Sequence, residues 1–142
     1  MERRTFRLGK GDALVIVDLQ RDFLPGGALP VPLGDQVVPV MNAYIRLFRE
    51  RELPVIATRD WHPPDHCSFR DQGGLWPPHC VQGTPGAEFA EYLDLPEDAI
   101  VISKATRPDE EAYSGFQGTA LDLSLIHISE PTRPLYISYA VF

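Results

Sequence analysis

The sequence predicts a single α/β domain in which helices flank a parallel sheet. Short continuous apolar runs recur along the chain, a segment between them has the apolar spacing of a helix, and each run ends near a charged residue. Such runs are typical of strands buried on both faces, and their alternation with helices implies a parallel sheet. The length of 142 residues fits one domain.

The first two expected elements are a strand at residues 13–17 and a helix at residues 36–51. The strand sequence, Ala-Leu-Val-Ile-Val, is wholly apolar and ends at Asp18. The helix ends in a basic cluster, which complements the negative end of a helix dipole. Its expected apolar face comprises Val37, Val40, Met41, Tyr44, Ile45 and Phe48.

Two further strands are expected at residues 54–58 and 99–103, with a short helix at residues 88–95 between them. Arg59 and Asp60 follow the first of these strands, and Lys104 follows the second. In open parallel sheets, ligands bind outside the carboxyl ends of the strands. Asp18, Asp60 and Lys104 are therefore expected to share one crevice.

Composition narrows the class of partner. The net charge is −7 and basic residues are scattered, so a nucleic-acid partner is not expected. No apolar run approaches the ~20 residues of a membrane span, and the first residues lack the pattern of a secretory signal. We expect a soluble, cytoplasmic protein with no membrane partner, whose two cysteines stay reduced.

A metal site is the first functional candidate. Asp60 and His62 are two positions apart, so both face one side of an extended backbone, and His79 follows two prolines that stiffen the chain. One carboxylate and two imidazoles suit zinc, iron or manganese. His66 is a candidate fourth ligand. The alternative is that these histidines satisfy local hydrogen bonds in loops.

Asp18 and Lys104 are candidates for proton transfer and charge stabilisation. Partial burial would raise the pKa of Asp18 toward that of a general base, and a fixed lysine can stabilise a developing oxyanion. The alternatives are a turn cap for Asp18 and a solvated side chain for Lys104. On spacing alone either Cys67 or Cys80 is open as a nucleophile, although structural burial is the favoured interpretation for both.

Three sequence blocks resemble the nicotinamidase/pyrazinamidases of the isochorismatase-like hydrolase superfamily. They are residues 18–23 (Asp-Leu-Gln-Arg-Asp-Phe), residues 59–66 (Arg-Asp-Trp-His-Pro-Pro-Asp-His) and residues 76–88, which begin Trp-Pro-Pro-His-Cys. Residues 103–104 and 113–119 follow the same order, and the resemblance extends over about residues 10–123. It implies a Rossmann-like, three-layer fold.

The resemblance also implies roles for individual residues. The expected reaction is metal-dependent hydrolysis of nicotinamide to nicotinic acid and ammonia by a Cys-Asp-Lys triad, a step of NAD salvage. Asp18 would be the base and Lys104 the cation, while Asp60, His62 and His79 would bind the metal. Phe23, Trp76 and Tyr113 would line the substrate pocket. Self-association is common in the family and is left open here.

The sequence departs from the family where the nucleophile is expected. No cysteine follows Cys80, so we expect negligible amidase activity from this chain. Residues 1–123 are expected to form the N-terminal part of the hydrolase domain, with the C-terminal part missing and residues 124–142 a non-native tail. Strand-like residues 135–141 would then fill the open edge of the first strand. The alternatives are a noncatalytic metal- and nicotinamide-binding module, and a hydrolase of another small amide or ester.

Overall fold

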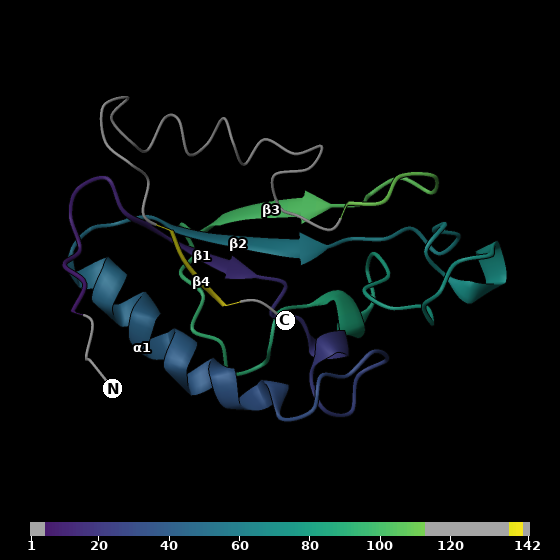
Figure 1. Ribbon diagram of the computed structural model, residues 1–142, viewed down its shortest axis with the longest axis horizontal. Helices are drawn as coiled ribbons and strands as arrows, with labels where there is room; N and C mark the ends of the chain where they lie inside the picture. Colours follow the sequence, from purple (N-terminus) through teal and green to yellow (C-terminus); the bar gives the residue numbers. More distant parts are fainter. Residues whose placement is uncertain (1–4, 113–136, 141–142) are drawn as a thin grey trace.

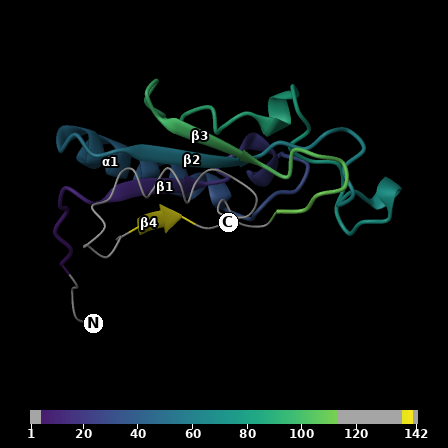
Figure 2. The same ribbon diagram turned by 90° about the horizontal axis from the view of Figure 1, so that it is seen from above.

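The computed structural model describes residues 5–112 and 137–140 (Figure 1). Their strands form one parallel sheet in the order β3-β2-β1-β4, and Figure 2 shows them side by side from above. This confirms the α/β class with a parallel sheet. The elements are β1 (Ala13–Val17), α1 (Val37–Glu50), β2 (Val55–Asp60), β3 (Ile100–Lys104) and β4 (Ile137–Ala140), with 3-10 turns η1 (Arg21–Phe23), η2 (Gly34–Gln36), η3 (Arg70–Gln72) and η4 (Pro85–Ala87).

Strand β1 is buried on both faces, as its apolar run predicted. Leu14 and Ile16 belong to the core beneath α1, whereas Ala13 and Val15 belong to a second cluster with Ile56 and Ile102. Because successive side chains of a strand point to opposite faces, one apolar run feeds both cores.

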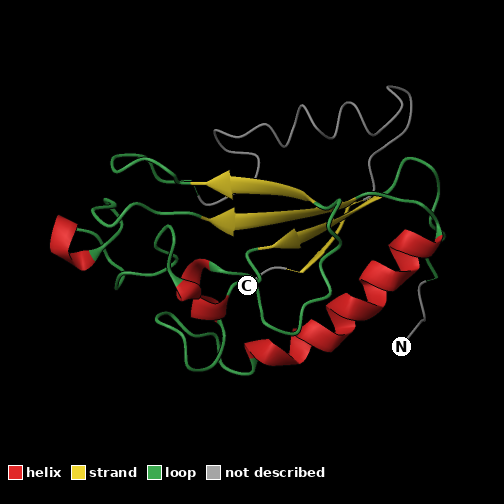
Figure 3. Ribbon diagram, turned by 180° about the vertical axis from the view of Figure 1, so that it is seen from behind, coloured by secondary structure: helices red, strands yellow, loops and turns green. Residues whose placement is uncertain are grey.

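Helix α1 covers one face of the sheet (Figure 3). Val38, Met41, Ile45 and Phe48 form its buried face. The predicted face is wrong at Val40 and Tyr44, which are 52% and 44% exposed. The buried stripe runs through positions 38, 41, 45 and 48, so these two side chains lie at the margin of a narrower contact than the sequence pattern indicated.

The short helix predicted at residues 88–95 is wrong. The backbone N–H of Arg21 donates to Glu88 O at 2.9 Å, that of Ala90 donates to Leu19 O at 2.9 Å, and Gln20 and Phe89 form an antiparallel bridge. The carbonyl of Glu88 and the N–H of Ala90 are therefore paired with the chain after β1 and are not available for a helix. This segment lies against the loops at the carboxyl end of the sheet.

Strand β4 pairs in parallel with β1, from Ala13↔Ile137 to Ile16↔Ala140. The expectation that residues 135–141 fill this edge is confirmed for residues 137–140, while residues 135, 136 and 141 lie outside the described part. Within the described residues, no helix has the length and apolarity to cross a bilayer.

Candidate active site and metal centre

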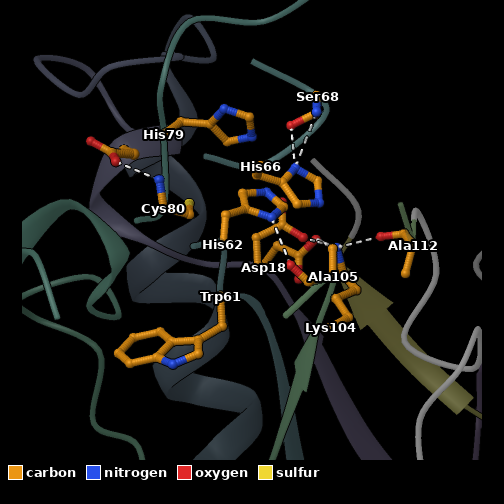
Figure 4. Close-up of polar contacts among 12 residues, drawn as sticks. Asp18, Trp61, His62, His66, Ser68, His79, Cys80, Lys104, Ala105 and Ala112 are labelled. Carbon is orange, nitrogen blue, oxygen red and sulfur yellow. Dashed lines mark hydrogen bonds and ion pairs between the residues drawn. The ribbon is translucent and has the colours of Figure 1, made fainter. Parts of the chain in front are cut away.

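The polar strand ends meet at one edge of the sheet, as predicted. Asp60 pairs with Lys104 in the β2–β3 ladder, and the Asp18 N–H donates to Thr58 O at 3.1 Å. Asp18 has a φ of 52°, in the left-handed region that few side chains other than glycine favour. The backbone turn at Asp18 ends β1, and it leaves the carboxylate beside the neighbouring strand ends (Figure 4).

Lys104 lies between two carboxylates. Its Nζ is 2.8 Å from Asp18 Oδ2, donates a hydrogen bond to Asp60 Oδ1, and is 3.5 Å from Ala112 O. The lysine is only 3% exposed. Two carboxylates and one ammonium leave the cluster with a residual negative charge, which favours a cation nearby.

The two carboxylates differ in their pKa. Burial raises the pKa of Asp18, and the charge of Lys104 offsets this only in part. For Asp60, burial also acts upward, but the hydrogen bond with His62 and the charge of Lys104 outweigh it and lower the pKa. Lys104 stays protonated because Asp18 and Asp60 raise its pKa against the effect of burial. Asp18 is thus the carboxylate better suited to accept a proton.

Asp60, His62 and His79 form the one group of potential metal ligands found among the described residues. One ligand atom from each lies within 4.8 Å of the others. Metal–ligand bonds of ~2.0–2.2 Å place ligand atoms about 3–4 Å apart, so a small closure of the group would accommodate an ion. Residues 19 positions apart in sequence therefore meet where the sequence predicted.

Backbone carbonyls orient both imidazoles. His62 Nδ1 is 3.0 Å from Ala105 O, and His79 Nδ1 is 2.8 Å from Pro77 O. A carbonyl only accepts, so each Nδ1 carries a proton, and Nε2 is the ring nitrogen left to face an ion. Burial lowers the pKa of His79, which favours its neutral ring.

His62 Nε2 lies 3.6 Å from Asp60 Oδ2. An imidazole nitrogen and a carboxylate oxygen at this separation are both atoms that bind divalent cations. The donor set of one carboxylate and two imidazoles thus fits zinc, iron or manganese.

His66 lies beside this group without joining it. Its ring stacks on that of His62 with centroids 4.1 Å apart. Nε2 is 2.8 Å from Glu110 O, so it carries the proton, and Nδ1 accepts from the Ser68 hydroxyl at 2.6 Å. Both ring nitrogens are occupied, so this geometry does not support the predicted fourth ligand.

A cavity of about 250 Å³ opens onto the metal group. Phe23 and Trp76, which the resemblance assigned to the substrate pocket, line this cavity, whereas Tyr113 lies outside the described residues. The volume falls below the ~300–1,000 Å³ typical of drug-sized ligands and so suits a small substrate. A larger hollow of about 760 Å³, beside α1 and Tyr92, contains none of the metal group.

Phe69 is a site residue that sequence reasoning missed. Its buried ring lies edge-on to three imidazoles, with centroids 5.6 Å from His62, 5.7 Å from His66 and 5.5 Å from His79. Such contacts fix ring orientation. No periodic pattern marks Phe69, because it lies in an irregular loop. The same loop turns Trp61 away from the histidines (Figure 4).

Neither cysteine has the setting of a nucleophile. Cys80 is fully buried, and burial together with nearby carboxylates raises its pKa far above the ordinary value. Cys67 is half-buried and lines a separate hollow with Gly73, Gly74 and Leu75. The predicted burial is therefore confirmed for Cys80 and only partial for Cys67.

The sequence matches the isochorismatase domain family over residues 12–128. Nicotinamidase from Escherichia coli (strain K12) is 40% identical over an alignment of 131 positions, which covers 78% of this chain and 62% of that protein. The curated relatives that match are all longer, and this chain spans 54–62% of their length.

Solved structures give the same likeness. Pyrazinamidase of Pyrococcus horikoshii in complex with zinc has a TM-score of 0.84 and 57% identity, over 92% of this chain and 71% of that one. A protein from L. infantum in complex with nicotinate has a TM-score of 0.80 and 36% identity, over 93% of this chain and 68% of that one.

Proposed function

The chain belongs to the isochorismatase domain family of hydrolases, and on that premise we propose that its site is that of a metal-dependent nicotinamidase. The reaction is hydrolysis of nicotinamide to nicotinic acid and ammonia. One observation carries the proposal: the Asp60, His62 and His79 ligand atoms converge beside the buried Asp18–Lys104 pair, on the wall of a small aromatic-lined cavity.

Asp60, His62 and His79 hold the metal in this proposal. When bound, the ion supplies a Lewis acid for the pyridine nitrogen of the substrate, which orients the carboxamide. Phe23 and Trp76 provide apolar walls for the ring; Phe23 lies 5.7 Å from the His79 ring, between centroids. Tyr113 is proposed as a further border of this pocket. A likeness to zinc-bound and nicotinate-bound structures supports these assignments.

Asp18 and Lys104 handle the proton and the charge. Asp18 takes the proton from an attacking thiol, whose sulfur bonds to the amide carbon, and passes it to the leaving nitrogen, so that ammonia departs. Water then cleaves the thioester to the acid. Lys104 stabilises the negative charge on the amide oxygen during attack. Its ion pair with Asp18 supports this role.

The attacking thiol is the part that this chain does not supply. Cys80 is buried with a raised pKa, and Cys67 lines another hollow. We therefore propose that the 142-residue chain binds metal and substrate but turns over negligible nicotinamide. We further propose that residues 1–123 are the N-terminal part of the hydrolase domain and residues 124–142 a tail outside it. The unpaired cysteines fit a reducing compartment, and we propose the cytoplasm.

Isothermal calorimetry of nicotinamide binding, with and without zinc, tests the proposal. We expect heat of binding only with zinc, and no ammonia release above that of buffer. Binding that ignores zinc would refute the metal's role. If the unmodified chain releases ammonia and Asp18→Asn abolishes that release, the chain is catalytically complete and the proposed inactivity is wrong. A stronger response to another small amide would change the substrate and keep the site.

A further inference from the structure

The segment that follows β1 does more than supply Asp18. Two of its side chains, Gln20 and Asp22, reach the backbone of two different metal-binding segments. Neither Gln20 nor Asp22 is one of the three potential metal ligands. Their hydrogen bonds, however, fix the peptides on which Asp60 and His79 are carried.

The Gln20 side chain continues the hydrogen bonding to β2 past the point where the β1 backbone turns away. The left-handed turn at Asp18 takes the chain away from β2, and Asp18 O accepts instead from the Gln20 N–H at 2.8 Å. Asp60 thereby loses the neighbouring backbone on that side. The Gln20 side-chain amide takes its place, because Oε1 accepts from the Asp60 N–H at 2.9 Å and Nε2 donates to Asp60 O at 2.8 Å.

This amide is also tied to a third segment. Gln20 Nε2 donates to Ala87 O at 2.9 Å, and the side chain is completely buried. Three of its four hydrogen-bonding positions are therefore in use at short distances. A side chain held this rigidly fixes where the Asp60 peptide lies, and with it the direction of the ligand carboxylate.

Asp22 holds the other side of the centre. Its Oδ2 accepts from the Cys80 N–H at 2.8 Å, which belongs to the peptide joining His79 to Cys80. Cys80 has a φ of 47°, so its backbone is held in a conformation unfavourable for a side chain. Oδ1 accepts from the Ala28 N–H at 3.1 Å. A Cβ on residue 86 would overlap the Asp22 carboxylate, so the carboxylate fits there only because residue 86 is glycine.

We propose that Gln20 and Asp22 are positioning residues of the metal centre, acting through Asp60 and His79 respectively. This inference rests on the proposed metal site. It predicts that metal affinity depends on two residues that do not bind the metal. Partners of this kind typically change metal affinity by ~10–100-fold when they are replaced.

The variants remove the hydrogen bonds with little change of volume. Gln20→Met has nearly the same shape but no donor or acceptor for Asp60. Asp22→Asn keeps one acceptor oxygen and turns an NH₂ group toward the other backbone N–H, so one of the two bonds is lost.

Asn42→Leu is a matched control. Asn42 makes the same kind of double backbone bond, donating to Tyr92 O at 2.8 Å and accepting from the Asp94 N–H at 2.8 Å. It lies on α1, away from the metal group, so its loss affects stability without affecting the ligands.

Zinc titration of the 142-residue chain and its melting temperature are measured for each protein, with the visible spectrum of bound cobalt as a report on ligand geometry. We expect Gln20→Met and Asp22→Asn to weaken zinc binding by about 10–100-fold and to alter the cobalt spectrum. Asn42→Leu should lower the melting temperature and leave zinc affinity within about twofold, because no bond to a ligand segment is lost.

Zinc affinities of both variants within twofold of the control would overturn the inference. If Gln20→Met does not fold, Asp22→Asn decides by the same criterion. A wild-type chain that binds no zinc would refute the proposed metal site itself, which is a different outcome from a site that binds zinc regardless of residues 20 and 22.

Discussion

The metal-ligand group and the Asp18–Lys104 pair lie side by side at the same sheet edge, yet their polar atoms are satisfied in different ways. Asp18 and Lys104 neutralise each other at 2.8 Å, and Thr58 donates a further hydrogen bond to Asp18 at 2.8 Å. His62 and His79 are held through Nδ1 by backbone carbonyls, and His62 Nε2 lies 3.6 Å from Asp60 Oδ2.

The charges of the Asp18–Lys104 pair balance each other without a metal, whereas the ligand group needs a bound cation to satisfy its donor atoms. Buried charges are tolerated when they are paired, so removal of one partner of the lysine pair should destabilise the apo protein. The imidazoles are potential metal ligands, whose contribution to stability appears when an ion is bound. Asp60 belongs to both groups, because it contacts Lys104 and His62. Added metal should therefore offset the destabilisation caused by substitution of Lys104, whereas substitution of a ligand histidine should abolish the stabilisation that metal gives.

Replacement of Lys104 should have the largest effect. Lys104→Met leaves Asp18 and Asp60 buried without their counter-charge, and breaking a buried pair costs about 3–5 kcal/mol of unfolding free energy. Urea denaturation without metal measures this loss. Zinc should stabilise the variant more than the wild type, since the cation takes over part of the role of the ammonium.

The double variant Asp18→Asn with Lys104→Met serves as the control for this prediction. It removes one of the two facing carboxylates and should recover part of the lost stability. A loss below about 1 kcal/mol for Lys104→Met would place the pair among weak, solvent-screened ion pairs and contradict its role as a buried counter-charge.

The second prediction compares His79 with His66. Zinc at a hundredfold excess over its dissociation constant stabilises a folded protein by about 2.7 kcal/mol. His79→Ala should abolish this gain, because one of three ligands is lost. His66→Ala should keep it, although the variant should lose about 1–3 kcal/mol without metal, since Ser68 and Glu110 lose their buried partner. Thermal unfolding with and without zinc measures both effects.

A zinc response lost in His66→Ala would mean that the His66 ring turns to bind the ion, as the sequence hypothesis allowed. A response retained in His79→Ala would exclude His79 from the centre. The His66 ring stacks on that of His62, so His66 is close to the proposed ligands. The comparison of its variant with His79→Ala therefore distinguishes a ligand from a neighbouring imidazole.

The sequence was most informative where chemistry and periodicity are local. The apolar runs predicted β1, β2 and β3 to within one or two residues, because strands buried on both faces need continuous apolar sequence. Strand ends then placed Asp18, Asp60 and Lys104 together. The prediction failed at residues 88–95, where hydrogen bonds to Leu19 and Arg21 override local helix preference.

The environment of the metal group could not be predicted in the same way. Phe69, Gln20 and Asp22 act through contacts between segments 40 or more residues apart, or through an irregular loop, and no spacing rule records such contacts. The occupation of both His66 nitrogens depends on Ser68 and Glu110, and Glu110 lies 44 residues away. A tautomer is set by three-dimensional neighbours, which sequence pattern does not give.

The smallest effect on the metal centre is expected from removal of residues 124–142. β4 pairs with β1 from Ala13 to Ile16, whereas Asp18 and the ligand segments lie past the carboxyl end of β1. A chain ending at residue 123 should therefore melt at a lower temperature, because β1 becomes an open edge. Its zinc affinity should stay within about twofold of the full chain, since none of the hydrogen-bonding partners of Asp60, His62 and His79 among the described residues is removed. A loss of tenfold or more, measured by the same zinc titration, would show that the tail supports the metal centre and belongs to the domain.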